Sequence, residues 1–165
     1  MVALTVERAD WEDPRAAALR EGMELEMGTL YAPLANSLAP GVMDKLRVGF
    51  DVLPGTIAAT VLALDGDVVI GQAGLRPHRT DAGAALEVKK VVVAPEHRGR
   101  GASRLLMAAL EHAARERGIR RLILQTGLLQ PAAIALYEKI GYAAIEPYPP
   151  YQLMPGALCY EKQLD

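Results

Sequence analysis

The stretch VVVAPEHRGRGASRLLMAAL, from Val91 to Leu110, joins a predicted strand to a predicted helix. The valine run favours a strand, and Pro95 ends it because proline lacks the N–H that a strand ladder uses. A helix is predicted over 101–118, where apolar residues recur on one face. Two glycines, Gly99 and Gly101, lie in the joint between these elements.

Such a joint has the features of an anion-binding loop. A helix N-terminus leaves backbone N–H groups unpaired, and glycines before it let a ligand approach the backbone closely. Arg98, Arg100 and Arg104 add positive charge. The alternative is a tight turn with solvated arginines. The sequence has no Walker phosphate loop, and a dinucleotide-binding G-x-G-x-x-G is excluded because Arg104 stands where the last glycine belongs.

The composition limits the class of protein. The 165 residues suit a single domain over 1–165, and a net charge of −2 argues against nucleic-acid binding. The single cysteine, Cys159, excludes an internal disulfide and fits a cytoplasmic setting. We find no metal-ligand spacing among Cys159 and the three histidines, no signal-peptide pattern and no apolar run of membrane-spanning length. We therefore expect no metal and no membrane association.

The remaining pattern alternates between strands and helices. We predict strands over 4–9, 85–95 and 119–126, a β-hairpin over 56–77 turning at 65–67, helices over 13–33, 101–118 and 131–141, and two closing strands within 142–164. Gly22 is expected to divide the first helix, and 77–84 is expected to be a loop. Residues 34–54 carry no clear pattern. The order predicts a mixed α/β sheet in one domain.

Two segments in this order resemble the GNAT acetyltransferase superfamily. Its acetyl-CoA loop, often written Q/R-x-x-G-x-G/A, here reads RGRGAS over 98–103, with Ser103 where glycine or alanine is usual. The segment LQTGLLQPAAIALYEKIGY, residues 124–142, is similar to the family's later region, with Gln130 where asparagine is frequent. The resemblance implies a mostly antiparallel, splayed sheet flanked by helices. It also implies acetyl-CoA as co-substrate and a primary amine as acceptor.

The resemblance assigns roles to particular residues. Glu87 is the candidate general base, and the alternative is a strand carboxylate paired with Lys89 or Lys90. Tyr137 is the candidate general acid for the leaving thiolate, and the alternative is an aromatic residue packed under its helix. The implied cofactor-binding residues are Val91, Val92, Val93, Arg98, Gly99, Arg100, Gly101, Ala102, Ser103, Arg104 and Gln130.

The acceptor end is less defined by the sequence. Carboxylates at Glu21, Glu24 and Glu26 and the rings of Tyr148 and Tyr151 suit a cationic amine. The alternative is a solvated helix face and a loop stiffened by prolines. The family resemblance also allows a homodimer. A second functional hypothesis is a GNAT-fold module that binds acyl-CoA without catalysis, although the presence of both Glu87 and Tyr137 favours an enzyme.

Overall fold

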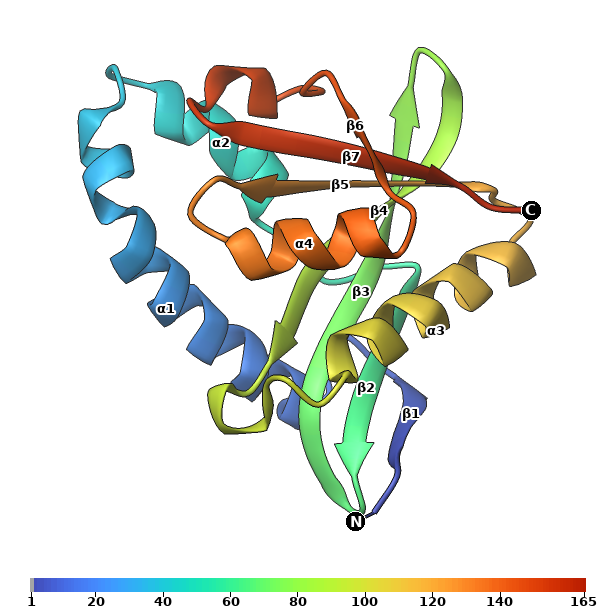
Figure 1. The fold of residues 1–165 in the computed structure, drawn as a ribbon. Coiled ribbons are helices and arrows are strands. Elements are labelled where there is room, and N and C mark those ends of the chain that lie inside the picture. Colours follow the sequence, from blue (N-terminus) through green and yellow to red (C-terminus); the bar gives the residue numbers. More distant parts are fainter. Residues whose placement is uncertain (1) are drawn as a thin grey trace.

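The computed structural model describes residues 2–165 (Figure 1). Four α-helices, two short 3₁₀ helices and seven strands follow one another along this part of the chain. The elements are β1 (Leu4–Ala9), α1 (Pro14–Ser37), α2 (Val42–Phe50), β2 (Ala59–Asp65), β3 (Val68–Thr80), β4 (Gly83–Val93), η1 (Pro95–His97), α3 (Ala102–Glu116), β5 (Arg121–Gly127), α4 (Pro131–Lys139), β6 (Ala143–Ile145), η2 (Tyr151–Leu153) and β7 (Ala157–Gln163).

The strands form one sheet in the order β1-β2-β3-β4-β5-β7-β6. All neighbouring strands are antiparallel except β4 and β5, which run parallel. Helices α3 and α4 cover one face, and α1 with α2 covers the other. The predicted mixed, mostly antiparallel sheet flanked by helices is therefore confirmed.

The sheet is splayed between β4 and β5. These strands pair only at Leu86 with Leu122 and at Glu87 with Ile123, and they separate beyond that point. A bulge at Lys90 and Val91 faces Ala73 of β3, since the register shifts between Gln72 and Gly74. A bulge bends its strand and strengthens the local twist, so it directs the end of β4 away from β5.

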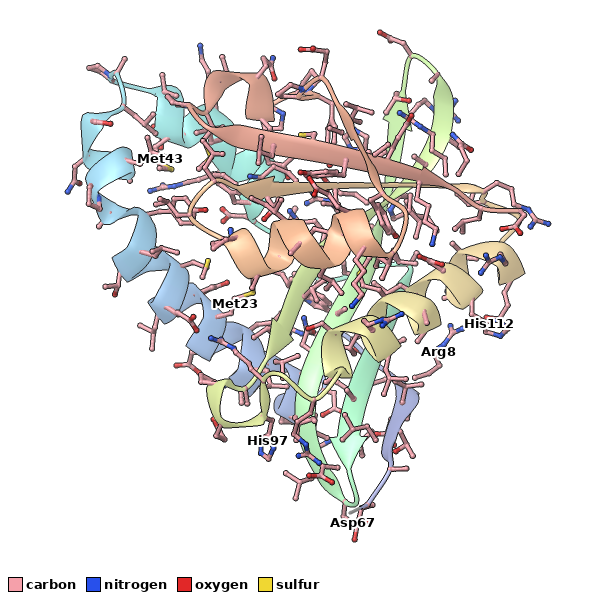
Figure 2. All side chains as sticks on the ribbon, in the orientation of Figure 1. Arg8, Met23, Met43, Asp67, His97 and His112 are labelled. Carbon is pink, nitrogen blue, oxygen red and sulfur yellow. The ribbon has the colours of Figure 1, made fainter. Side chains whose placement is uncertain are left out.

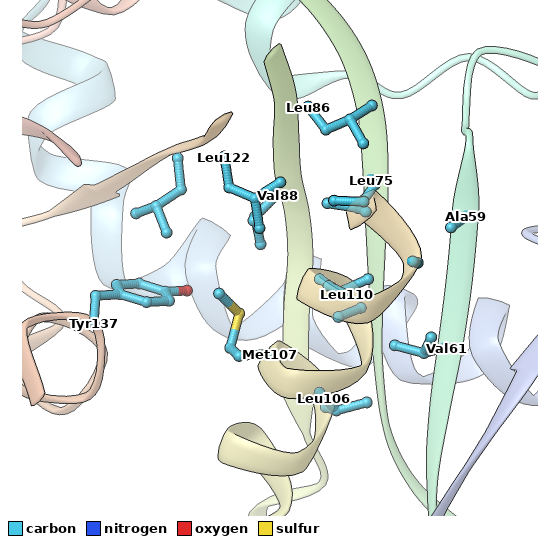
Figure 3. Close-up of a cluster of buried hydrophobic side chains, with 14 of the residues drawn as sticks. Ala59, Val61, Leu75, Leu86, Val88, Leu106, Met107, Leu110, Leu122 and Tyr137 are labelled. Atoms are coloured by element: carbon cyan, nitrogen blue, oxygen red, sulfur yellow. The ribbon is translucent and has the colours of Figure 1, made fainter. Parts of the chain in front are cut away.

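The main core lies between the sheet and the face covered by α3 and α4. Leu106, Met107 and Leu110 of α3 are fully buried, and they pack against strand residues that include Leu75 and Leu122 (Figure 3). Burial of a side chain of this size stabilises the fold by roughly 1.5–3 kcal/mol. This core holds the joint between β4 and α3 in place.

The predicted break at Gly22 is wrong, because α1 continues from Pro14 to Ser37 without interruption. Asp13 caps it by accepting a hydrogen bond from the Arg15 N–H at 2.9 Å, as its N-cap pattern predicts. A glycine inside a helix costs only about 1 kcal/mol relative to alanine. Near its start, the helix buries Ala16 against Leu62 and Leu64.

The predicted loop over 77–84 is also wrong, because β3 and β4 extend through it to a tight turn after Thr80. Proline is disfavoured inside a sheet because it has no N–H to donate to the ladder. However, β2 partners β3 only as far as Leu75, so Pro77 lies where one edge of β3 is free. Proline is tolerated at such an edge because no ladder hydrogen bond is lost there.

Three further observations concern the chemical character of the chain. Cys159 is buried in β7, where burial raises the pKa of its thiol to about 11. Between residues 2 and 165, no helix is both long and apolar enough to cross a bilayer. The same residues contain no group of three or more His, Cys, Asp or Glu side chains arranged to hold a metal ion.

Candidate active site

A cavity of about 360 Å³ lies where β4 and β5 separate. Strand residues 88–91 and 124–126 line it, together with Gln130 and Tyr137 of the α4 segment. Helices α1 and α2 supply the opposite wall. Figure 1 shows α1 and α4 on either side of the divergence between β4 and β5. The volume is typical of small-molecule sites, which range from about 300 to 1,000 Å³.

The glycine-rich joint has the geometry of an anion loop. Gly99 and Gly101 have positive φ angles of 79° and 87°. Residues other than glycine adopt this backbone conformation only at an energetic cost. The first hydrogen bond of α3 runs from Leu105 N–H to Gly101 O at 3.2 Å, and no side chain caps the helix. The N–H groups of Ala102 and Ser103 therefore have no intrahelical acceptor. Their use by a phosphate stays a prediction.

The arginines of the loop make different contacts. The Arg98 guanidinium donates to both carboxylate oxygens of Glu26 on α1, at 3.0 and 2.7 Å, and to Val93 O. Arg100 is paired with Asp65 at 2.6 Å. Arg104 is exposed on α3. Exposed ion pairs of this kind contribute only about 0–1 kcal/mol, so Arg98 and Arg100 lock the loop weakly while the backbone is left to face a ligand.

The end of β4 has one open edge. Val92 and Val93 are buried and pair with Gln72 and Gly71 of β3, whereas Val91 lines the cavity. On the other side, β4 has no strand partner after Glu87. An extended ligand can pair with such an edge as an added strand does. The predicted role of Val91, Val92 and Val93 toward the pantetheine arm rests on this edge.

The bulge on β4 is held from the side of α1. Lys90 has a positive φ of 55°, which is uncommon for a residue with a side chain. The fully buried Gln72 amide donates to Lys90 O, and its oxygen accepts a hydrogen bond from Arg20 at 2.9 Å. Arg20 in turn lies 3.8 Å from the centre of the Trp11 ring. These contacts satisfy a carbonyl that the broken ladder leaves without a strand partner.

Tyr137 lies at the wall of the cavity, and its role as general acid stays a prediction. It is 7% exposed, lines the cavity, and within residues 2–165 its hydroxyl makes no hydrogen bond. Figure 3 shows the hydroxyl directed from α4 toward β4, beside Val88 and Met107. Burial raises the pKa of Tyr137 to about 12, so the group is protonated at neutral pH. Nearby, the Gln130 amide donates to the Tyr31 hydroxyl at 3.1 Å.

Glu87 has a different environment. Its side chain is 1% exposed and does not line the cavity formed by the described residues. One oxygen accepts from Arg76 Nη2 at 2.5 Å, and the other accepts from the hydroxyls of Tyr148 at 2.8 Å and Tyr151 at 3.2 Å. The sequence suggested Lys89 or Lys90 as an alternative partner, but the partner is Arg76. The role of Glu87 as a base stays a prediction.

Lys89 is the site residue that the sequence did not identify. It is 8% exposed, lines the cavity, and donates from Nζ to Gly49 O at 2.7 Å and to the Tyr151 hydroxyl at 3.2 Å. Burial lowers its pKa to about 8, although nearby Glu87 opposes this shift. A sequence signal exists, since LEVKK places Lys89 in alternation with Glu87 on one side of an otherwise apolar strand.

The lowered pKa of Lys89 predicts how stability changes with pH. The unfolded chain retains the lysine proton up to about pH 10.4, whereas the folded state releases it near pH 8. The unfolded state thus holds the Lys89 proton more firmly between these values, so this residue alone adds about 2 kcal/mol to the free energy of unfolding from pH 8 to 10. The raised pKa values of Cys159 and Tyr137 act in the opposite direction over this range, so the contribution of Lys89 is measured as a difference between two proteins. In urea unfolding at several pH values, the wild type should gain about 2 kcal/mol relative to Lys89→Met, and equal slopes in both proteins would contradict the expectation.

The candidate acceptor residues are divided among several roles. Glu24 lines the cavity and lies 3.8 Å from Lys90, whereas Glu26 is occupied by Arg98 and Glu21 is exposed. Tyr148 and Tyr151 are buried and bind Glu87. The hydrogen bonds to Glu87 account for the positions of the two rings. The predicted contact of these rings with an acceptor stays a prediction.

Comparisons with known proteins agree with this geometry. Residues 43–142 match the model of the acetyltransferase (GNAT) family. The uncharacterized N-acetyltransferase YjgM of Escherichia coli is 37% identical over 136 residues, which span 82% of this chain and 78% of that protein. The IAA acetyltransferase of Azospirillum brasilense is 42% identical over 78 residues, 47% of this chain. That alignment spans 51% of the Azospirillum protein, or about half its length.

Solved structures extend the likeness to the whole fold. A crystal structure described as an acyl-CoA N-acyltransferase from Klebsiella pneumoniae has a TM-score of 0.75 and 28% identity, and the match covers 98% of each chain. A GNAT family acetyltransferase from Elizabethkingia anophelis, with acetyl-CoA bound, has a TM-score of 0.61 at 16% identity, covering 98% of each chain. The second likeness concerns the fold alone. The chain belongs to the GNAT family of acetyltransferases.

Proposed function

We propose that the protein transfers an acetyl group from acetyl-CoA to a primary amine. The observation that carries this proposal is the cavity at the divergence of β4 and β5, which Tyr137 lines with a hydroxyl that makes no hydrogen bond within residues 2–165. The glycine-rich joint follows directly after β4 and offers free backbone N–H groups. Family membership supports the same activity.

The residues that would hold acetyl-CoA follow from this arrangement. The N–H groups at 101–103 suit the pyrophosphate, with Gly99 leaving room for it. The open edge of β4 suits the amides of the pantetheine arm. Arg104 lies exposed on the first turn of α3, where it can attract phosphate, and Gln130 lines the reaction cavity. Bound in this way, acetyl-CoA supplies the thioester that is consumed.

Groups of the protein would stabilise the charge that develops on the thioester and transfer the protons of the reaction. The acceptor nitrogen forms a bond to the thioester carbon, and the carbon–sulfur bond breaks. A backbone N–H at the bulged end of β4, near Val91, can stabilise negative charge on the carbonyl oxygen. Tyr137 gives its proton to the departing sulfur, and the proton that the amine loses restores the hydroxyl through solvent, so the products are an amide and a free thiol.

The amine must also lose a proton, and two routes are open to test. Glu87 is the base that the family resemblance assigns, although its oxygens are occupied by Arg76, Tyr148 and Tyr151. Alternatively, the amine enters neutral and releases its second proton to water. The second route gains support from the apolar cavity and the Lys89 ammonium, which both disfavour a charged amine.

A thiol-release assay tests the activity. The protein is incubated with acetyl-CoA and a panel of primary amines, and free thiol is followed over time. Release that depends on the added amine is expected. Tight binding of CoA without turnover for any amine would overturn the proposal in favour of an acyl-CoA-binding module.

The loop geometry yields a prediction for Gly101→Val. A positive φ at this position is strained for valine, and the new side chain would crowd a bound phosphate. Acetyl-CoA affinity should fall at least about 10-fold, as measured by calorimetric titration. Gly55→Val is the matched control, because Gly55 also has a positive φ and open space around it. Equal losses of affinity in both variants would contradict the phosphate role of the loop.

The domain organisation, the cellular location and the oligomeric state remain predictions. We propose that the chain acts as one domain, because strands from both ends of the described residues join one sheet. The buried single cysteine suits the predicted cytoplasmic location. Light scattering of the purified protein would decide between a monomer and the homodimer that the family resemblance allows.

A further inference from the structure

The interior of the site carries one more positive than negative charge. Arg76 and Glu87 form an ion pair at 2.5 Å, so their charges offset each other. Lys89 lies beside this pair, and within residues 2–165 its two acceptors, Gly49 O and the Tyr151 hydroxyl, are both neutral. An ammonium without a carboxylate is unfavourable in a buried position. A ligand that brings an anionic group would remove this imbalance.

The position of Lys89 makes its charge available to a ligand. It follows the last paired residue of β4 by two positions, so it lies where β4 and β5 begin to separate. Its side chain is 8% exposed and lines the cavity together with Tyr137. An ammonium has three donors, and two are used by Gly49 and Tyr151. The third donor has no acceptor among the described residues, so a ligand in the cavity could accept it.

The wall opposite the strands is apolar and rich in methionine. Met23 and Met27 of α1, Met43 of α2 and Met154 after η2 all line the cavity, which accounts for four of the six methionines in the chain. Met23 and Met43 can be located on α1 and α2 in Figure 2. Methionine is unbranched and polarizable, so such a wall adapts to apolar groups of different shape. Leu46 and Phe50 extend the same surface.

The carboxylates are in the wrong place for a polyamine. Among the described residues that line the cavity, Glu24 is the sole acidic one, and its side chain is 66% exposed and near Lys90. A second ammonium on the acceptor would find the Lys89 cation and a methionine wall instead of an anionic partner. The charge pattern therefore favours an acceptor whose second polar group is anionic.

We propose that the acceptor is a free amino acid with a large apolar side chain, its carboxylate bound by Lys89 and its side chain by the methionine wall. The inference rests on the proposed N-acetyltransferase function. In an α-amino acid the carboxylate is one carbon away from the amine. A carboxylate on Lys89 thus leaves the nitrogen close to the mouth of the β4–β5 gap, where the thioester would lie. The cavity of about 360 Å³ suits a ligand of this size.

The test compares amino acids with amines that lack the carboxylate. Methionine, leucine and phenylalanine are paired with 3-(methylthio)propylamine, isoamylamine and phenethylamine, and glycine and spermidine complete the panel. Because the amine pKa differs within each pair, kcat/KM is calculated per neutral amine from measurements below about pH 8, where the Lys89 ammonium persists. We expect each apolar amino acid to exceed its decarboxylated partner by about 10- to 100-fold, the value of a hydrogen bond to a charged group. Glycine and spermidine should be poor acceptors.

Lys89→Met tests the residue itself. The ratio of kcat/KM between amino acid and decarboxylated amine should fall about 10-fold or more, because methionine keeps much of the shape and lacks the charge. Lys139→Met is the matched control, since Lys139 is an exposed lysine at the end of α4. Calorimetric titration with acetyl-CoA shows whether the variant site is intact. If Lys89→Met does not fold, carboxylates are compared with the matching alcohols as stabilisers of the wild-type protein in the presence of CoA. 4-Methylpentanoate should then raise the melting temperature more than 4-methylpentanol does.

The outcomes separate this inference from the function on which it rests. Acetylation of the panel without preference for a carboxylate, or an unchanged ratio in Lys89→Met, overturns the amino-acid proposal and leaves the acetyltransferase function standing. A preference for spermidine does the same. Binding of acetyl-CoA with no amine-dependent thiol release overturns both.

Discussion

Tyr137→Phe is expected to lower kcat by about 10²–10⁴-fold, the range that a general acid typically contributes. The change removes only a hydroxyl that lines the cavity and makes no hydrogen bond within residues 2–165. The aromatic ring keeps its contacts with Tyr142 and Tyr160. Folding and acetyl-CoA affinity should therefore remain close to wild type. Steady-state kinetics with one good acceptor, together with calorimetric titration, measure the two effects.

The pH dependence separates this role from mere packing. The pKa of Tyr137 is raised to about 12 by burial, and the active form is the protonated one, which is present below that pH. The wild-type enzyme should thus show no alkaline loss from this residue up to about pH 11. The variant should not recover at high pH, because added base does not replace a missing acid. A variant that keeps wild-type kcat, with chemistry shown to limit the rate, would assign the proton to water.

Glu87→Gln is expected to destabilise the protein by about 3–5 kcal/mol, because it leaves the buried charge of Arg76 without its partner. Among the described residues, Arg76 would keep hydrogen bonds to the carbonyl groups of Gly49 and Asp51, but it would no longer face a negative charge. In a domain of this size, each kcal/mol corresponds to about 2–4 °C in Tm. Thermal unfolding and urea titration measure the loss. Arg76→Gln and the double variant complete a cycle that isolates the energy of the pair.

The same variant tests the catalytic role of Glu87. If Glu87 is the base, kcat falls at neutral pH and recovers at high pH, where more of the amine is already neutral. If Glu87 only supports Lys89 and the two tyrosines, kcat of the variant changes by the same factor at all pH values. The measurement is made at a temperature where the variant is folded. Tyr148→Phe is a useful control, because it removes one hydrogen bond to Glu87 and no charge. A stable, fully active Glu87→Gln would contradict both roles.

Local patterns predicted the joint between β4 and α3 closely. The strand predicted over 85–95 is β4 at Gly83–Val93, and the helix predicted over 101–118 is α3 at Ala102–Glu116. Both depend on apolar periodicity and on glycine and proline signals that act within a few residues. Helix α2, within the stretch that carried no pattern, begins after Gly41 without a side-chain cap. Its start therefore has none of the usual sequence marks.

The partners of the charged residues could not be predicted in the same way. Arg98 binds Glu26 across 72 positions, and Arg100 binds Asp65 across 35. Glu87 binds Tyr148 across 61 positions. Such pairs exist only because the sheet and α1 bring distant segments together. Lys89 was missed for the same reason, since its importance depends on Arg76 already neutralising Glu87.

The splayed sheet has a consequence for how the molecule divides its stability between folding and binding. A regular parallel ladder between β4 and β5 would continue past Glu87, but here it stops after two pairs. On the β5 side, the backbone groups of β4 beyond that point have no strand partner within residues 2–165, and the proposed extended ligand would pair with them. The free protein is thus an incomplete sheet, and in the proposed binding mode acetyl-CoA would supply the missing strand in each catalytic cycle. A sequence that continued the ladder between β4 and β5 would raise the free energy of unfolding, and it would also close the gap in which the reaction is proposed to take place.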